Sequence, residues 1–463
     1  MRGYGETDMN ENRFDTVRLT RSPERFEVLQ NTDGYADILL EGEMCPCNGF
    51  DEDERGFSHE HIYAKVICES DGALAIPPVK VTVEKKKFSV LIKGIPVGGP
   101  YMIDFVFLKR ESCSEYSIRG DKVYHVFVGD LYLIAGQSNA AGMARGELSE
   151  TAEIGISVLR NLEAWDVATS PMADDTRHNM FLPFAKKIRK ETGIPIGLIP
   201  SAVGGAPLSR WLPSEDGDLY RRAMNAVGGR KLRGVLWYQG CADAGDGYST
   251  EDYVRRFSDF VSTVRRDVGD ELLPVFTFQL NRQRRRDRDE ELNELYDGIR
   301  EAQRLVPHRI DGVYVLPAID ALNMSDFIHN SRPSNAMLGE RLARQVLEKL
   351  YGKGLGADAP EIASATLAED GVVVAEFANV REFLSDLNSR TDEYPLVVCD
   401  TDGAVGISGV RISANKVYLT LARPVKLPAT LSGQCGFSPL NIIIDYATGI
   451  PVLCFKNFPI TAK

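Results

Sequence analysis

The sequence predicts a mixed α/β protein in which a central α/β domain lies between two β domains. Three observations support this. Residues 1–128 contain short runs of alternating apolar residues separated by Gly and Pro turns, residues 129–354 alternate between strand-like and helix-like runs, and residues 355–463 return to the β pattern. A chain of 463 residues is also too long for one ordinary core. We therefore expect three domains with these boundaries.

The first domain shows period-two alternation or β-rich composition at residues 79–84, 88–93 and 101–108. The Gly-Gly-Pro run at 98–100 predicts a turn before the last of these strands. Residues 45–60 are polar and are expected to form a mobile loop.

The central domain has six strand candidates separated by helical runs, which favours a mainly parallel sheet with helices on its faces. The predicted strands are 131–135, 156–159, 196–200, 234–238, 275–279 and 313–316. Apolar residues recur on one face over 252–268, and Ser249 and Asp252 have the spacing of a capping box at its start. A second apolar stripe predicts a last helix over 335–350.

The third domain carries β-rich runs, and the flanking β segments are expected to form one sandwich together or two separate ones. Its predicted strands are 371–377, 396–399, 416–421 and 441–444.

Composition excludes several function classes. The formal net charge of -12 argues against nucleic acid or an anionic membrane surface as the main partner. No apolar run reaches membrane-spanning length, and the polar start shows no signal peptide, so a cytoplasmic protein is expected. The eight cysteines are scattered apart from Cys45-Pro46-Cys47, which lacks the spacing of a zinc site. We expect idle thiols in a reducing compartment and no metal.

A charge cluster at residues 282–291 follows a predicted strand end. A solvated loop is one interpretation. The other is a rim that contacts an acidic substrate, because ligands of α/β sheets bind at this edge.

One short run carries the strongest chemical signal. Residues 130–139, Asp-Leu-Tyr-Leu-Ile-Ala-Gly-Gln-Ser-Asn, form an apolar strand that ends in a small-residue turn and presents Ser138 between Gln137 and Asn139. Such a turn displays a nucleophilic hydroxyl, although a serine that only caps a helix is the simpler alternative.

A serine nucleophile needs a base and an acid that orients the base. His329 stands out among the six histidines because Asp326 precedes it by three residues, which places both side chains on one side of a helical turn. Asp320 is a competing acid with a longer reach, and a helix-capping Asp326 beside a surface His329 is the alternative without function.

An ester's oxyanion needs preorganised donors. The backbone amide of Ser138 is one, and the Gly204-Gly205 turn after a strand supplies another, with Gly204 preferred. Gln239 follows the next strand and offers a side-chain amide, although it could also be a satisfied polar residue below a buried Trp237.

These segments, in the order Ser, Gly, amide and Asp-x-x-His, resemble the conserved blocks of the SGNH hydrolases, specifically the sialate O-acetylesterase branch of carbohydrate esterases. The similarity extends over most of residues 90–463. It implies a flavodoxin-like three-layer α/β/α domain, here with flanking all-β segments, and a metal-free and cofactor-free serine mechanism.

The resemblance also implies roles for individual residues. Ser138 is the nucleophile, His329 the general base and acid, and Asp326 its orienting residue, with Ser138, Gly204 and Gln239 in the oxyanion hole. The neighbouring residues would support the site or contact the sugar. The supporting residues are Gln137, Asn139, Gly205, Cys241 and Asp243, and the substrate contacts are Arg210 and Trp211. Trp211 could instead belong to the core or to the wall of the cleft.

Two departures from the family pattern bear on activity. Cys241 stands where the branch usually has glutamate, and a thiol cannot accept two strong hydrogen bonds. The stretch from His329 to Gly339 is longer than the usual version.

The resemblance implies removal of O-acetyl groups from carbohydrates, with sialic acids favoured and acetylated xylan as the nearest alternative substrate. The partner is thus an O-acetylated carbohydrate, and the oligomeric state is left open. Two other hypotheses are a glycan-binding family member without turnover and a lipid or thioester hydrolase of the same superfamily.

Overall fold

The computed structural model describes residues 16–45, 62–109, 114–146, 150–284, 290–323, 326–354, 356–369, 371–388 and 393–462. The chain packs into two compact units. The first comprises the described residues up to Leu131 together with Ala152–Ala168 and Gly193–Leu198, and the second comprises Tyr132–Thr151, Thr169–Thr192 and Ile199–Lys463. Each unit is described separately below.

The first unit is built mainly from antiparallel β-strands. One sheet has the strand order β10-β1-β3-β7-β6. Its strands are β1 (Thr16–Arg21), β3 (Tyr35–Cys45), β6 (Val83–Glu84), β7 (Lys87–Pro96) and β10 (Arg119–Gly120). In β7 every second residue is buried over most of its length, which is the pattern of a sheet with one face on a core.

A second group of strands in this unit runs β5-β4-β8, and β8 also pairs with β9 and with the first half of β11. The strands are β2 (Val28–Gln30), β4 (Ile62–Cys68), β5 (Val79–Val81), β8 (Gly98–Lys109), β9 (Ser114–Ser117) and β11 (Val123–Gly136). Apolar side chains of both groups share one core, among them Leu40, Ile62, Ile92 and Phe105. The β pattern predicted for this part of the chain is therefore confirmed, while residues 46–61, where a mobile loop was predicted, lie outside the described residues.

Two further strands, β12 and β13, and the first three residues of β14 belong to the first unit. β12 (Ile156–Arg160) pairs in parallel with β14 (Ile196–Pro200) and antiparallel with β13 (Ala164–Val167). Since β11 runs through the predicted boundary at residues 128–129, the predicted domain limits stay a prediction.

The second unit contains the parallel part of the α/β fold. The last residues of β11 pair in parallel with β15 (Gly234–Tyr238), β15 with β16 (Val275–Gln279), and β16 with β17 (Val313–Pro317). All residues of β15 and β16 are buried, as expected for parallel strands with covered faces.

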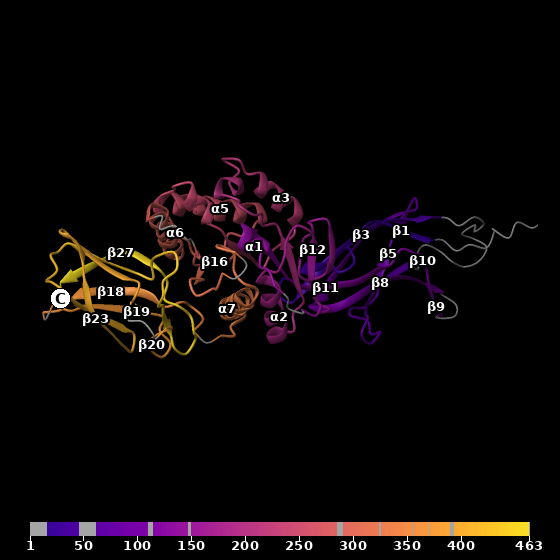
Figure 1. Cartoon of the computed structure of the whole chain (residues 1–463). Helices are drawn as coiled ribbons and strands as arrows, with labels where there is room; N and C mark the ends of the chain where they lie inside the picture. Colours follow the sequence, from indigo (N-terminus) through magenta and orange to yellow (C-terminus); the bar gives the residue numbers. More distant parts are fainter. Residues whose placement is uncertain are drawn as a thin grey trace, which may run out of the picture. The chain divides into compact units, whose positions relative to one another are not determined.

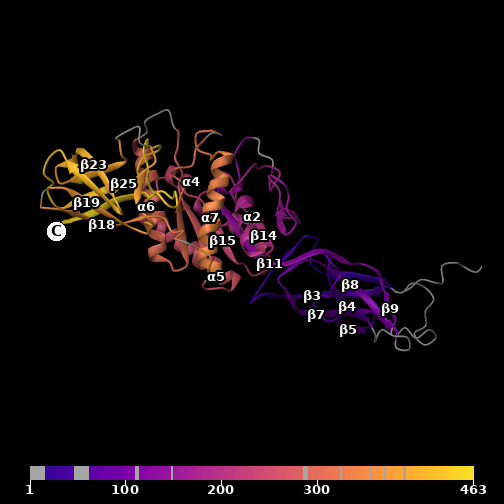
Figure 2. The ribbon, with the colours of Figure 1, turned by 90° about the horizontal axis from the view of Figure 1, so that it is seen from below.

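Helices α3, α5 and α6 lie on one side of β16, and α2 and α7 lie on the other (Figure 1). Figure 2 gives the view from below, with α7 in the foreground. The helices of this unit are α1 (Ser138–Ala141), α2 (Phe181–Thr192), η2 (Leu208–Trp211), α3 (Asp218–Val227), α4 (Cys241–Gly245), α5 (Thr250–Val268), α6 (Glu290–Arg309) and α7 (Arg332–Tyr351).

The six predicted strands and both predicted helices of the α/β domain are present. The Ser249 hydroxyl accepts a hydrogen bond from the Asp252 amide at the start of α5, as the capping pattern predicts. Helix α7 begins at Arg332, three residues before the predicted start, because Ser331 caps it and Pro333 fits its first turn.

The C-terminal part of the second unit is an eight-stranded sheet with the order β22-β21-β25-β27-β18-β19-β24-β23, beside a two-stranded sheet of β20 and β26. Its strands are β18 (Glu361–Leu367), β19 (Val373–Ala378), β20 (Leu384–Asp386), β21 (Leu396–Asp400), β22 (Gly403–Val405), β23 (Ile407–Ser413), β24 (Lys416–Leu421), β25 (Ala429–Gly433), β26 (Ile443–Asp445) and β27 (Phe455–Ala462). A separate apolar cluster, including Phe377, Val398, Leu419 and Phe455, forms its core.

The protein is thus a mixed α/β fold with β-rich regions before and after the α/β part, as the sequence predicts. Within the described residues, no helix combines the length and the apolar character that crossing a membrane requires.

Candidate active site

The candidate site lies at the carboxyl edge of the parallel strands of the second unit. Ser138 follows β11, Gln239 follows β15, Asn281 follows β16, and the segment with Asp326 and His329 comes after β17. Because the carboxyl ends of parallel strands meet at one edge of a sheet, this topology gathers residues that are far apart in the sequence.

Gly136 to Asn139, called the nucleophile turn because Ser138 is the predicted nucleophile, is fixed by the end of the neighbouring strand. A Cβ at Gly136 would lie 2.3 Å from the Tyr238 carbonyl oxygen, and the φ of Gly136 is +124°, so only glycine fits there. The Gln137 amide donates to the Tyr238 carbonyl at 2.9 Å, and the Gln137 Oε1 accepts from the Gly240 amide at 2.9 Å. The supporting role predicted for Gln137 therefore has a physical basis, which is to join the ends of β11 and β15.

Ser138 is the first residue of the short helix α1 and is 7% exposed. The N-cap position belongs to Gln137, which makes no side-chain capping bond. The capping alternative for Ser138 is therefore wrong, and its side chain is left for another role.

The glycine turn after β14 lies against the nucleophile turn. The Val203 amide donates to the Gly136 carbonyl at 3.3 Å, and a Cβ at Gly204 would come within 4.0 Å of the Ser138 Cβ. Gly204 and Gly205 are both exposed, and Gly205 has a φ of +68°. Gly204 is thus brought to Ser138, which agrees with the preference for Gly204 as a donor.

The side chains of Asp326 and His329 are in contact, as their spacing predicts. The Asp326 Oδ2 lies 2.6 Å from the His329 Nδ1, and the Asp326 Oδ1 accepts from the amides of Ile328 and His329 at 2.9 and 2.8 Å. Burial raises the pKa of Asp326, but these amides and the imidazole outweigh it, so the pKa lies below its usual value. Residues 326–329 form a bend rather than a helical turn.

The His329 Nε2 is buried and has no hydrogen-bond partner among the described residues. A buried imidazole nitrogen without a partner is uncommon in a folded protein. In apo enzymes the bond between base and nucleophile is often long and tightens only with substrate.

Asn139 connects the nucleophile turn to the histidine segment, defined here as residues 326–330. Its Nδ2 donates to the Ile328 carbonyl at 3.4 Å, and its Oδ1 accepts from the Asn330 amide at 3.1 Å. One side chain next to Ser138 thus holds the backbone on both sides of His329.

Two further asparagines hold the histidine segment, and sequence reasoning missed both. Asn281 donates to the Ile328 carbonyl at 2.9 Å and to the Asn330 Oδ1 at 2.7 Å. Asn323 donates to the Phe327 carbonyl at 3.1 Å. Asn281 comes directly after the buried strand β16, and a polar residue at a strand's carboxyl end is the signal that could have identified it.

Gln239 is fully buried, and the structure does not direct its amide toward Ser138. Its Nε2 donates to the Ala206 carbonyl at 3.2 Å and to the Asp243 carboxylate, which uses both amide hydrogens. Its Oε1 accepts from the Tyr253 hydroxyl at 3.2 Å. These bonds match the alternative of a satisfied polar residue near the buried Trp237.

Asp243 is also fully buried and accepts bonds from several groups. The Leu208 amide donates to both of its oxygens, and the Arg256 Nη1 lies 3.2 Å from its Oδ1. Burial raises the pKa of Asp243 despite these partners. The supporting role predicted for Asp243 is therefore structural: it fixes the chain after the glycine turn.

Cys241 is the first residue of α4, next to Gln239 and Asp243 in sequence. Burial raises the pKa of the Cys241 thiol to about 11, although a hydrogen bond to Tyr296 acts in the opposite direction. A thiol that stays protonated is a poor nucleophile, which agrees with the choice of Ser138.

Of the two residues predicted to contact substrate, Trp211 presents no free aromatic surface and Arg210 is held in an ion pair. Trp211 is fully buried and packs edge-on against Trp237, with ring centroids 5.4 Å apart. A sugar cannot stack on it, so the structure corrects this prediction in favour of the core alternative. Arg210 is paired with Asp218 through bonds of 3.0 and 2.5 Å.

Asp320, the competing acid, is paired elsewhere. Arg341 donates to its two oxygens at 2.9 and 2.6 Å. Of the charge cluster, Arg282 donates to the Ile319 carbonyl and is largely buried, while residues 285–289 lie outside the described residues.

Possible metal ligands gather at a different place. In the part of the chain that the structure describes, Asp297, Cys435 and Cys454 have ligand atoms within 4.8 Å of one another. None of the residues around Ser138 belongs to this group.

Comparison with known proteins agrees with this geometry. Residues 128–348 match the family of carbohydrate esterases described as sialic acid-specific acetylesterases. A probable carbohydrate esterase of Arabidopsis thaliana is 27% identical over 169 residues, which are 35% of this chain and 60% of that protein. The chain thus spans about 60% of the length of this curated relative.

The crystal structure of a carbohydrate acetylesterase from Xanthomonas citri has the same fold. The TM-score is 0.65 at 21% sequence identity, and the match covers 96% of this chain and 99% of that chain. The segment from residue 128 to residue 348 is therefore similar to the sialic acid-specific acetylesterase family of carbohydrate esterases.

Proposed function

We propose that the protein is a serine esterase that removes O-acetyl groups from carbohydrates, with Ser138 as nucleophile, His329 as general base and acid, and Asp326 as its orienting residue. The observation that carries the proposal is the pair of Asn139 bonds, which hold the backbone on both sides of His329 next to the nucleophile turn. The 2.6 Å contact between Asp326 and His329 completes the arrangement.

In the proposed reaction, the Asp326 carboxylate orients the imidazole through Nδ1. The His329 Nε2 takes the Ser138 proton as Oγ attacks the acetyl carbonyl carbon. The same proton then passes to the departing sugar oxygen, which leaves an acetyl group on Ser138. Water, deprotonated by His329, attacks this acetyl-enzyme, and acetate and the free serine hydroxyl result.

The oxyanion of both tetrahedral intermediates needs donors. We assign this role to the backbone amides of Ser138 and Gly204. Gln239 remains a predicted third donor, but its bond to the Ala206 carbonyl supports a positioning role for it, because the Ala206 amide closes the glycine turn through its bond to the Val203 carbonyl.

The proposal includes the finer fold prediction. A three-layer, flavodoxin-like SGNH domain is supported by parallel strands with helices on both sides of β16. The flanking strands would form β-sandwiches.

O-acetylated sialic acid is the preferred substrate class, because the matched family is described as sialic acid-specific. Acetylated xylan is the alternative. No cofactor and no metal take part in the proposed reaction.

The deciding experiment measures acetate release from O-acetylated sialic acid and from acetylated xylo-oligosaccharides, with wild type beside Ser138→Ala. Release that depends on Ser138 supports the esterase and ranks the two substrates. Equal release by the folded Ser138→Ala variant would contradict the assignment.

Two controls separate the other hypotheses. A fluorophosphonate probe should label wild type at Ser138, whereas a glycan-binding protein without turnover would stay unlabelled. Nitrophenyl esters of increasing chain length should show a preference for acetate, and a preference for long chains would favour a lipid or thioester hydrolase.

A further inference from the structure

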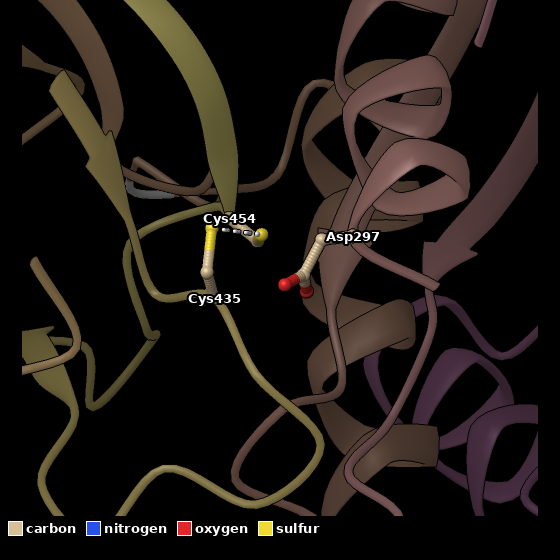
Figure 3. Close-up of side chains that lie close together, drawn as sticks. All are labelled: Asp297, Cys435 and Cys454. Atoms are coloured by element: carbon tan, nitrogen blue, oxygen red, sulfur yellow. Dashed lines mark hydrogen bonds between the residues drawn. The ribbon is translucent and has the colours of Figure 1, made fainter. Parts of the chain in front are cut away.

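Two cysteine side chains at the C-terminal sheet lie close enough for their sulfur atoms to react with each other. Cys435 comes shortly after β25, and Cys454 directly precedes β27, 19 residues later. Their sulfur atoms lie 3.6 Å apart (Figure 3). Cys454 is fully buried, whereas Cys435 keeps part of its surface exposed. An oxidant from solvent therefore meets Cys435 first.

The backbone around Cys435 is fixed by helix α6. Both oxygens of Asp297 accept from the Gly436 amide, at 3.1 and 2.9 Å, and Arg300 donates to the Gly436 carbonyl at 2.7 Å. Cys454 is fixed from the other side, since its amide donates to the Gln279 Oε1 at 2.8 Å. These bonds fix the backbone positions of both cysteines.

Asp297 makes the group resemble a metal site, but its carboxylate is already in use. It accepts from Gly436 and from the Arg300 Nη1, at 2.8 Å from Oδ1. A metal ion bound here would lie close to a fully buried guanidinium, and two such cations repel each other strongly. The arrangement therefore favours covalent chemistry between the sulfurs over metal binding.

We propose that Cys435 and Cys454 form a redox-active pair that closes reversibly to a disulfide. With hydrogen peroxide as oxidant, the Cys435 thiolate attacks one peroxide oxygen, the O–O bond breaks, and Cys435 becomes a sulfenic acid with release of water. Cys454 then attacks the Cys435 sulfur, and the S–O bond breaks as a second water leaves. Two thiols and one peroxide thus give one disulfide and two waters, and a dithiol reductant reverses the reaction.

The first step belongs to Cys435 rather than to Cys454. Burial raises the pKa of Cys454 well above its ordinary value, so it stays protonated in the reduced protein. Its inertness toward solvent oxidants directs the first attack to Cys435.

Hydrogen bonds also connect the disulfide-forming pair to the candidate active site. The inference drawn from this connection rests on the proposed function. Arg300 donates to the carbonyls of Gly436 and Asn281, both at 2.7 Å. Asn281 in turn holds the Ile328 carbonyl beside His329. Movement of Cys435 toward Cys454 therefore acts on the histidine segment, and we expect the kcat of the oxidised protein to fall several-fold.

The test treats the reduced full chain with hydrogen peroxide, blocks remaining thiols with iodoacetamide and maps peptides without reduction. The expected product is a cross-linked pair of peptides containing Cys435 and Cys454, lighter by about 2 Da than the two reduced peptides together and lost on reduction. Cys435→Ser and Cys454→Ser should abolish it. Cys399→Ser, a half-buried cysteine of the same sheet, is the matched control and should leave it unchanged.

Two outcomes would overturn the proposed disulfide, and a third would overturn only its path to the active site. The first is oxidation of Cys435 to sulfinic acid with no cross-link. The second is stoichiometric zinc that survives desalting of wild type, protects both cysteines from alkylation and is lost in Asp297→Asn, which would establish a metal site. The third concerns only the path to the active site: a cross-link without any change in kcat would disprove it. Because the cross-link is read by mass, its absence is distinguishable from failure of the esterase assignment.

Discussion

The nucleophile turn and the histidine segment supply the two halves of the candidate site, but the fold holds them in different ways. The turn is continuous with the buried strand β11 and is fitted to Tyr238 and Gly240 of the adjacent strand end. The histidine segment lies outside the regular elements, and the side chains of Asn139, Asn281 and Asn323 hold it.

This difference predicts that substitutions in one region mainly affect stability and substitutions in the other mainly affect activity. Residues of the turn are packed against the core sheet, so changing them should affect folding. Residues 326–329 are exposed or half-exposed and are held by a few polar bonds, so changing them should affect turnover with little effect on folding. The predictions below test this separation, from the largest expected effect on turnover to the smallest.

Asp326→Asn should lower kcat by about 10³ to 10⁴, because an amide holds the imidazole in the wrong tautomer. The lowered pKa of Asp326 keeps the wild-type carboxylate ionised at neutral pH. Because the folded pKa is lower than the unfolded pKa, Asp326 contributes to folding stability above its unfolded pKa. This contribution is lost as the pH falls through the lower folded pKa. Acetate release and thermal unfolding at pH 7 are the measurements. A large fall in Tm together with normal kcat would contradict the separation.

Gly136→Ala should lower both stability and activity. The added Cβ would meet the Tyr238 carbonyl oxygen at 2.3 Å, at a φ of +124° that side chains rarely adopt. Strain alone costs about 1–3 kcal/mol, and the clash adds to it. Gly403→Ala is the matched control, since its φ is +101° and nothing lies within 4 Å of its Cβ. Thermal unfolding should show a much larger loss for position 136 than for position 403.

The two halves were also unequally predictable from the sequence. The turn was identified from contiguous residues, because Gly136, Gln137 and Ser138 lie at the end of a strand that the local apolar pattern predicts. The Asp326 and His329 pair was also identified from spacing. The asparagines that hold this pair were not, because Asn281 and Asn323 are brought to it only when β16 and β17 align.

The remaining errors have the same origin. Trp211 was assigned to the substrate side of the site, but its burial against Trp237 is a property of packed neighbours. The bonds of Gln239 to Ala206 and Asp243 were also not visible in the sequence, and its role as a third donor stays a prediction. The Cys435 and Cys454 contact was missed because 19 residues separate them and no short motif marks the pair.

Asn139→Ala should lower kcat by about 10-fold to 100-fold, since it removes both bonds that bring the histidine segment to the turn. Asn415→Ala is the matched control. Its Nδ2 also makes two bonds, to Glu376 and to the Phe377 carbonyl, but in the C-terminal sheet. Initial rates with an acetyl ester should separate the two variants, and equal rates would show that Asn139 does not position His329.

Cys241→Ser should change turnover at pH 7 by less than about two-fold, because a thiol with a pKa of about 11 is neutral there and does not act as nucleophile. The effect of this substitution is expected in folding stability at high pH. In the unfolded chain the thiol ionises near pH 8.5, whereas in the folded chain it stays protonated to about pH 11. The folded state therefore loses stability between these two values, since only the unfolded state releases the proton. The wild-type Tm should fall more steeply over this range than that of Cys241→Ser. Parallel curves would mean that the thiol is not held in its neutral form, and a clear loss of turnover would show that Cys241 is a matched part of the site.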